Sequence, residues 1–122
     1  MEYQRFEDTY VVRLNRGEEV TECLQALCKQ EGIRLGEVSG LGAADAAVVG
    51  LYNVSERKYY KKELRGMMEI TSLVGNITEK DGEVYLHIHI NLCDENLAVH
   101  GGHMNSCRIS ATGELLVQRK PG

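Results

Sequence analysis

The sequence predicts an α+β fold: one compact domain over residues 1–122, with a mainly antiparallel or mixed sheet of five or more strands and one principal helix. Several runs are rich in β-branched and aromatic residues and end at turn residues. One segment has helical spacing of apolar residues. Strands and helices do not alternate regularly, which disfavours a parallel βαβ sheet. A length of 122 residues suits a single hydrophobic core.

The first predicted elements are a strand and the helix. Residues 9–14 mix β-branched and aromatic side chains, predict a strand and stop at the turn 15–17. Residues 18–30 predict the helix, because Glu18 and Glu19 suit a first turn and Gly32 suits the position after the last. The apolar residues at helical spacing are Val20, Cys23, Leu24, Leu27 and Cys28.

The next segment predicts two strands around a glycine-rich bend. Residues 33–39 form a short strand, and the Ala- and Val-rich residues 45–53 form a buried one. Between them, residues 40–44 bring small side chains to a place where the backbone bends tightly or passes close to a neighbour. Gly40 and Gly42 do not make a dinucleotide-binding fingerprint, since a third glycine and a following helix are missing.

Residues 57–65 are the one basic and aromatic cluster. We interpret them as an exposed edge strand whose lysines prevent sheet-to-sheet aggregation. The alternative is a nucleic-acid surface on which Tyr59 and Tyr60 stack on bases. The formal net charge of −4 offers a phosphate backbone no general attraction, so direct nucleic-acid binding is not the favoured interpretation.

Three more strands complete the prediction, over residues 68–78, 83–92 and 107–119. The turn Lys80-Asp81-Gly82 joins the first two. We expect residues 98–104 to be a loop. Four cysteines lack CxxC spacing, and buried thiols are the preferred interpretation, although a Cys93–Cys107 disulfide is geometrically possible. No long apolar run or signal-peptide core is visible, so a cytoplasmic location and no membrane contact are expected.

Two histidines on one strand are the main chemical signal. His87 and His89 point to the same face, whereas Ile88 and Ile90 point to the core, because side chains alternate along a strand. Two imidazoles on one side can supply half of a tetrahedral zinc site. The alternative is a pair of surface histidines that hydrogen-bond to neighbours.

A third nitrogen ligand from His103 would complete a three-histidine set with one open position. Gly101 and Gly102 would let the chain turn sharply beside the site. His100 is a rival ligand on spacing alone, and His103 could instead cap a loop. Imidazole ligands also accept nickel, copper and iron, so zinc is the preferred metal rather than the only one.

Four motifs in order and spacing resemble the plants-and-prokaryotes-conserved (PPC) domain family. They are Gly40-Leu41-Gly42-Ala43, the run from Glu69 to Ile77, His87-Ile88-His89, and Gly101-Gly102-His103-Met104. The resemblance extends from about Tyr10 to Glu114.

The resemblance implies homotrimers whose subunit boundaries carry a metal site lined by His87, His89 and His103. His100 does not belong to the family pattern. Further polar positions of that pattern, without settled roles, match Arg13, Glu69, Asn76 and Glu114. Plant members carry AT-hook segments before this domain, and bacterial members are often labelled DNA-binding through that relationship. This chain lacks the Arg-Gly-Arg-Pro core of an AT-hook.

Two functions follow as hypotheses. The first is a metal-binding homotrimer that holds a divalent metal, with zinc as the expected ion, and acts by hydrolase or lyase chemistry on a small molecule. Glu69 and Glu114 are then candidate catalytic proton acceptors, although ion pairing with Arg13 is the alternative role for both. The second is an oligomerisation and interaction module with a DNA-associated regulatory role, in which the metal is structural.

Overall fold

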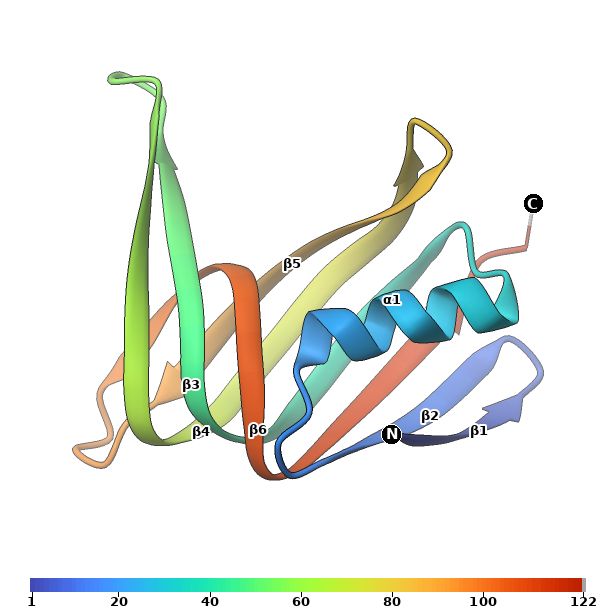
Figure 1. Ribbon diagram of the computed structural model, residues 1–122, viewed down its shortest axis with the longest axis horizontal. Coiled ribbons are helices and arrows are strands. Elements are labelled where there is room, and N and C mark those ends of the chain that lie inside the picture. The colour runs from blue at the N-terminus through green and yellow to red at the C-terminus, as the bar shows by residue number, and fades with distance from the viewer. Residues whose placement is uncertain (122) are drawn as a thin grey trace.

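The computed structural model describes residues 1–121 and is dominated by one sheet (Figure 1). Six strands are arranged in the order β1-β2-β6-β3-β4-β5, every pairing is antiparallel, and β5 also pairs with β6. The elements are β1 Glu2–Phe6, β2 Thr9–Asn15, α1 Val20–Glu31, β3 Gly36–Asn53, β4 Lys58–Lys80, β5 Glu83–Cys93 and β6 Val99–Arg119. The predicted antiparallel sheet with one helix is confirmed, with strands as the larger part.

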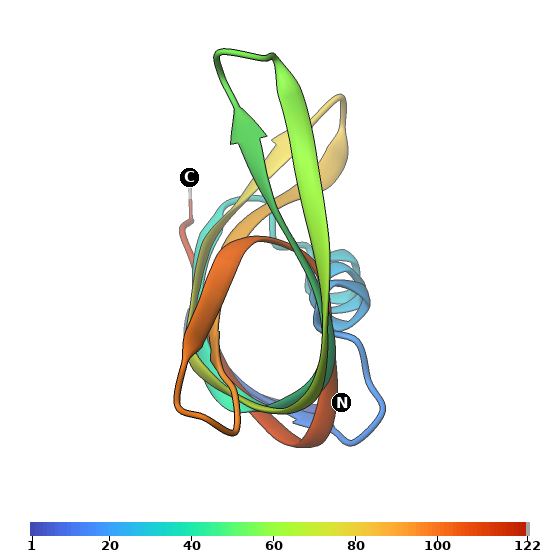
Figure 2. The same cartoon turned by 90° about the vertical axis from the view of Figure 1, so that its left-hand side faces the viewer.

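The sheet curves strongly, so that β5 and the first part of β6 lie side by side (Figure 2). Register shifts between Gly40 and Gly42 and between Ala44 and Ala46 mark irregularities in β3 where it turns. Such bulges bend a strand and increase its twist without ending it. The curvature therefore comes from irregular positions inside long strands.

Two predicted breaks between strands do not exist. Residues 36–53 form one strand, β3, where two were expected, and the predicted segments 57–65 and 68–78 are both parts of β4. The bend at Gly40 to Ala44 was predicted, but the strand continues through it by means of bulges. Strand β1 was not predicted. Residues Glu2–Phe6 are mostly polar and exposed, so they lack the alternation of apolar and polar residues that marks a strand packed on a core.

The end of β3 and the start of β4 form a hairpin, residues 48–63, whose outer part extends beyond the rest of the sheet (Figure 1). We call this hairpin the arm. Pairing between β4 and β5 begins only at Glu69, so Lys58 to Met68 pair with β3 alone. The predicted edge strand is thus confirmed.

The predicted loop over residues 98–104 was wrong, because Val99 to His103 pair with β5 as part of β6. Gly101 and Gly102 do not turn the chain. They allow close contact instead: a Cβ on Gly102 would lie 2.6 Å from the carbonyl oxygen of Gly50. The sharp turn expected at these two glycines was therefore wrong.

One face of the sheet is buried and the other is exposed. Helix α1 packs its buried residues Val20, Leu24 and Leu27 into the same core as the sheet residues Tyr10 and Ile88. Successive strand residues alternate between this face and the opposite one. We call the opposite face, which includes Val11, Ser39, Val74, His87 and His89, the outer face.

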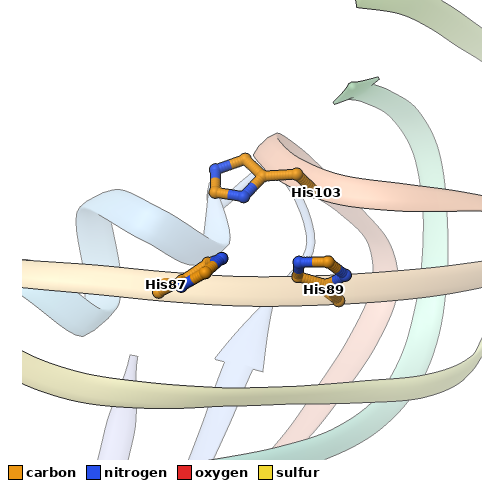
Figure 3. A group of neighbouring side chains, drawn as sticks. All are labelled: His87, His89 and His103. Carbon is orange, nitrogen blue, oxygen red and sulfur yellow. The ribbon is translucent and has the colours of Figure 1, made fainter. Parts of the chain in front are cut away.

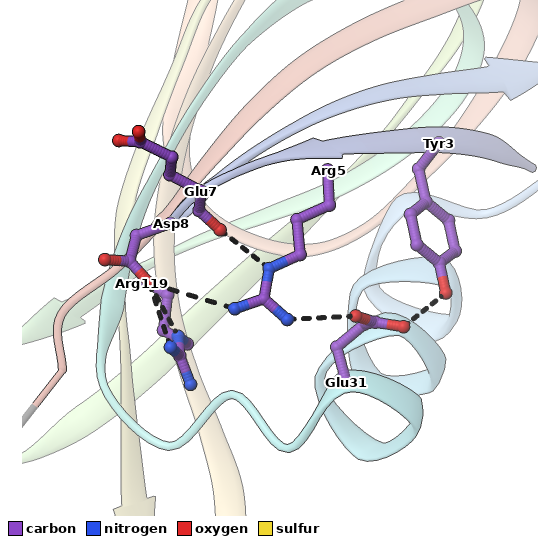
Figure 4. A network of polar contacts seen from close by, with 6 residues as sticks. All are labelled: Tyr3, Arg5, Glu7, Asp8, Glu31 and Arg119. Atoms are coloured by element: carbon purple, nitrogen blue, oxygen red, sulfur yellow. Dashed lines mark hydrogen bonds and ion pairs between the residues drawn. The ribbon is translucent and has the colours of Figure 1, made fainter.

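Polar contacts join the β1–β2 hairpin to the end of α1 and the end of β6 (Figure 4). The Tyr3 hydroxyl donates to the Glu31 carboxylate at 2.8 Å, and Arg5 lies 3.9 Å from the same carboxylate. Asp8 accepts from Arg119 at 2.9 Å. These contacts tie the peripheral strand β1 to the rest of the domain.

The four cysteines are free thiols, so the Cys93–Cys107 disulfide does not form. Cys28 and Cys107 are buried as expected, and burial raises the pKa of Cys28 to about 11 and that of Cys107 to about 12. Cys23 and Cys93 are only half-buried, contrary to the expectation of four buried thiols.

The helix begins two residues later than predicted, and Glu19 caps it. The Glu19 carboxylate accepts hydrogen bonds from the backbone N–H groups of Thr21 at 2.9 Å and Glu22 at 3.1 Å. It also accepts from the N–H of Cys107 on β6 at 2.9 Å, so the cap links helix and sheet. At the other end, Gly32 adopts φ 65°, the left-handed conformation expected after a helix.

We expect Glu19→Ala to lower the free energy of unfolding by about 1–3 kcal/mol, because three N–H donors lose their acceptor. Urea denaturation measures this change. The matched control is Gln25→Ala at an exposed helix position, expected to change stability by less than about 0.5 kcal/mol. Equal stabilities of the two variants would contradict the capping role.

Candidate metal centre

Three imidazole rings converge on the outer face (Figure 3). Each of His87, His89 and His103 offers a ring nitrogen, and these nitrogens all lie within 4.8 Å of one another. The ring centroids are 5.2 Å apart for His87 and His103, and 5.7 Å apart for His89 and His103. The structure therefore brings together the three residues that the sequence singled out.

The position of His103 follows from the switch of pairing partners along β6. His103 lies opposite His89 of β5 on one side and opposite Gly50 of β3 on the other. Directly opposed residues of an antiparallel pair lie on the same face of the sheet. His103 and His89 are therefore neighbours by register, and His87 joins them from two residues along β5.

No protein group holds these rings by a hydrogen bond within residues 1–121. The alternative interpretation, surface histidines bonded to their neighbours, therefore has no contact to support it in this part of the chain. Partial burial lowers the pKa of His103, and the nearby rings of His87 and His89 lower it further. A lowered pKa keeps the ring neutral, which is the form that binds a metal.

The donor set fits a divalent cation of intermediate softness. Two nitrogens on one tetrahedral zinc lie roughly 3.3 Å apart, as Zn–N distances of ~2.0–2.1 Å require. The ring nitrogens of the three histidines lie within 4.8 Å of one another, so small side-chain rotations would bring them to that spacing. His87 and His89 are exposed and His103 is half-buried, so the group is accessible from outside.

The two predicted catalytic glutamates lie outside the histidine group of the same chain. Glu69 lies opposite Cys93, four residues beyond His89 along β5. Glu114 lies opposite Arg13 in the middle of the sheet. No ion pair joins Arg13 to either glutamate within residues 1–121, so the ion-pair alternative is not observed there.

Asn76 and His100 were the remaining polar residues considered near the histidine group. Asn76 lies opposite His87 on β4 and so shares its face. His100 lies outside the group, and its Nε2 contacts Asp94 Oδ2 at 2.7 Å. That hydrogen bond is the main cause that lowers the pKa of Asp94.

A cleft of about 800 Å³ lies on the outer face next to the histidines. Val74, which lies directly opposite His89, is one of its lining residues, and Arg13 and Glu114 are others. Val11, Leu41 and Leu116 give the cleft an apolar wall. The cleft and the histidine group are thus adjacent parts of one surface.

A curved antiparallel sheet with one helix on its buried face and three convergent histidines on its outer face defines a small domain with a candidate metal centre. A model of the Plants and Prokaryotes Conserved (PCC) domain matches residues 1–120. The chain belongs to this family, for which the abbreviation PPC is also used. The resemblance inferred from the four motifs is confirmed.

Solved structures show the same fold. A protein of Bacteroides thetaiotaomicron, provisionally described as DNA-binding, is 31% identical with a TM-score of 0.96, covering 99% of this chain and 85% of that one. A PPC protein of Pyrococcus horikoshii is 30% identical with a TM-score of 0.86, covering 99% and 82%. A protein of Archaeoglobus fulgidus described as metal-containing is 30% identical with a TM-score of 0.85, covering 98% and 84%.

No curated protein matches the chain significantly. Residues 1–121 include no helix that is long and apolar enough to cross a membrane. The cytoplasmic location stays a prediction.

Proposed function

We propose that this chain is a divalent-metal-binding protein whose ligands are His87, His89 and His103. The convergence of three ring nitrogens within 4.8 Å carries the proposal. Three imidazoles with no cysteine among them are typical of sites that keep a position for an exogenous ligand, and zinc is the metal we expect. The metal-containing relative from Archaeoglobus fulgidus supports the same interpretation.

Metal content of untagged protein, purified without chelators or added metal, tests this proposal. Elemental analysis should find about one zinc equivalent per chain, and dialysis against a chelator should remove it while the fold persists. Protein that contains no metal and takes up neither Zn²⁺ nor Co²⁺ on titration would contradict the proposal.

The assembly we propose is a homotrimer, in which a second copy covers the outer face. Val11, Leu116, Ser39, Val74 and His89 are successive cross-strand neighbours, so one row runs across the sheet to the histidines. Val74 is 62% exposed and Leu116 is 50% exposed. Contiguous exposed apolar side chains are typical of interaction surfaces. A neighbouring copy on this row would also border the metal centre.

The chemistry we propose for the site is hydrolase- or lyase-type, on a small molecule that enters the adjacent cleft. A divalent cation bound there would act as a Lewis acid toward a substrate oxygen. Within one chain Glu69 and Glu114 lie outside the histidine group, so their proposed role as proton acceptors requires a glutamate from a neighbouring copy. Glu114 is exposed on the outer face, which a neighbouring copy would approach.

A second candidate function is an interaction module associated with DNA, in which the metal is structural. The arm and the two residues that follow it favour this function, because residues 56–65 hold five cations and two carboxylates in a chain of net charge −4. Arg65 pairs with Glu63, whereas Lys58, Lys61 and Lys62 have no carboxylate partner within residues 1–121. The relative from Bacteroides thetaiotaomicron is provisionally described as DNA-binding.

If the arm binds DNA, the dissociation constant should rise steeply with salt, because neutralising phosphates releases counterions. Lys61→Glu with Lys62→Glu should then weaken binding by ~100-fold or more at low salt. Fluorescence anisotropy with a labelled duplex measures both effects. The matched control is Lys29→Glu on helix α1, away from the arm. Binding that is insensitive to salt and to the arm variant excludes this function.

A further inference from the structure

A histidine that binds a metal usually donates its second ring N–H to a carboxylate, carbonyl or water, which fixes the plane of the ring. Within residues 1–121, His103 has no hydrogen bond of this kind. What lies against it is the aromatic ring of Tyr59, edge to face, with the centroids 6.1 Å apart and the planes at 88°. Tyr59 belongs to the arm, far from the motifs that predicted the metal centre.

Two features hold the hydroxyl end of the Tyr59 ring. Its hydroxyl contacts Asn105 Oδ1 at 2.8 Å, and Asn105 lies two residues after His103 on the same strand. Gly50 leaves the space that the hydroxyl occupies: a Cβ there would lie 2.1 Å from the Tyr59 oxygen. Because Gly50 is also the β3 neighbour of His103, the phenol lies over the strand position directly beside the histidine.

The neighbouring tyrosines lack this arrangement. Tyr60 follows Tyr59 on an alternating strand, so it faces the other side, where its hydroxyl donates to Glu56 at 2.6 Å. Tyr85 lies beside His87 with the centroids 6.4 Å apart, but no hydrogen bond fixes its hydroxyl within residues 1–121. Tyr59 is therefore distinguished by a ring contact, an anchored hydroxyl and a glycine that makes room for it.

We infer that Tyr59 is a positioning residue of the metal centre: anchored by Asn105 and seated over Gly50, its ring fixes the orientation of His103 as a ligand. This inference rests on the proposed metal-binding function. An aromatic contact of this type replaces the outer-shell hydrogen bond that a ligating histidine usually makes. It also makes the arm part of the site, because the arm carries both Tyr59 and Gly50.

Titration with Zn²⁺ and Co²⁺ tests the inference on the full chain. Tyr59→Ala should weaken both metals by about tenfold, within the range that outer-shell changes cause. It should also alter the visible absorption of bound Co²⁺, which reports the geometry of the ligands and does not respond to stability alone. Tyr59→Phe loses the contact with Asn105 but retains the ring beside His103, so it should weaken metal binding by no more than about threefold.

Gly50→Ala provides an independent variant, because its new methyl group displaces the tyrosine without removing it. It should reproduce the weaker binding and the altered Co²⁺ spectrum of Tyr59→Ala. Tyr60→Ala, on the other face of the same strand, is the matched control and should leave both unchanged. Thermal unfolding of each apo-variant checks that the fold is retained.

The outcomes separate this inference from the function on which it rests. If the parent protein binds neither metal, the proposed function fails. If the parent binds and His103→Ala does not, but Tyr59→Ala and Gly50→Ala match the parent in affinity and spectrum, the metal site stands and the role of Tyr59 is overturned. An equal loss in Tyr60→Ala, or a loss in Tyr59→Phe as large as in Tyr59→Ala, also overturns it.

Discussion

Replacing His103 by alanine should weaken Zn²⁺ binding by more than about 100-fold. Changes in the outer shell of a metal site already cost ~10–100-fold in affinity, so the loss of one of three protein ligands should cost more. His89→Ala should have the same effect, because its ring lies 5.7 Å from that of His103 in the same group. Competition with a coloured chelator measures the dissociation constants.

The matched control for this experiment is His100→Ala. His100 lies three residues before His103 on the same strand, but it contacts Asp94 and is outside the group. The control should therefore retain metal at parental affinity. Similar losses in both variants, or none in either, would refute the assignment of the ligands.

The same site should lose metal in acid. Protons compete with the metal for imidazole nitrogens, so occupancy should fall as the pH drops below the ordinary imidazole pKa of about 6.5. The pKa of His103 is lowered by burial and by the adjacent rings, so this ligand stays neutral to a lower pH than an unperturbed histidine.

Leu116→Glu should convert the proposed trimer into monomers. Leu116 is 50% exposed in a single chain, so the substitution should cost that chain little stability. In the assembly it would place a charge in an apolar interface, at a cost of about 3 kcal/mol per interface, or roughly 100-fold in affinity. Light scattering after gel filtration gives the mass, and circular dichroism checks the fold.

Val54→Glu is the control for the trimer experiment. Val54 is 78% exposed and lies in the turn of the arm, away from the apolar row on the outer face. This variant should keep the mass of the parent protein. A parent protein that is already monomeric at micromolar concentration would contradict the trimer itself. A trimeric Leu116→Glu variant would contradict only the proposed interface.

The alternation of residues in Tyr85 to Ile90 was enough to place two histidines on one exposed face. Because apolar Ile88 and Ile90 face the core, the alternation of side chains along the strand places His87 and His89 on the opposite face. The helix and its glycine stop were likewise predictable, because caps and apolar spacing act within a few residues of each other. These are the features that short-range physics determines.

The strand boundaries were less predictable, for a physical reason. Small residues from Gly40 to Ala44 can end a strand or accommodate bulges within it, and only the pairing with β4 and β6 decides between the two. Gly101 and Gly102 posed the same ambiguity. They are needed because the chain passes close to Asn91 and Gly50, which are distant in sequence, and not because the chain turns there.

By itself, the sequence determined the family, the three histidines and an exposed face for two of them. Tertiary structure alone decided that His103 lies opposite His89, that Glu69 and Glu114 lie apart from the group in one chain, and that Tyr59 lies against the site. Each of these depends on which distant strands pair and in what register. Register is a property of the whole sheet, and no local pattern contains it.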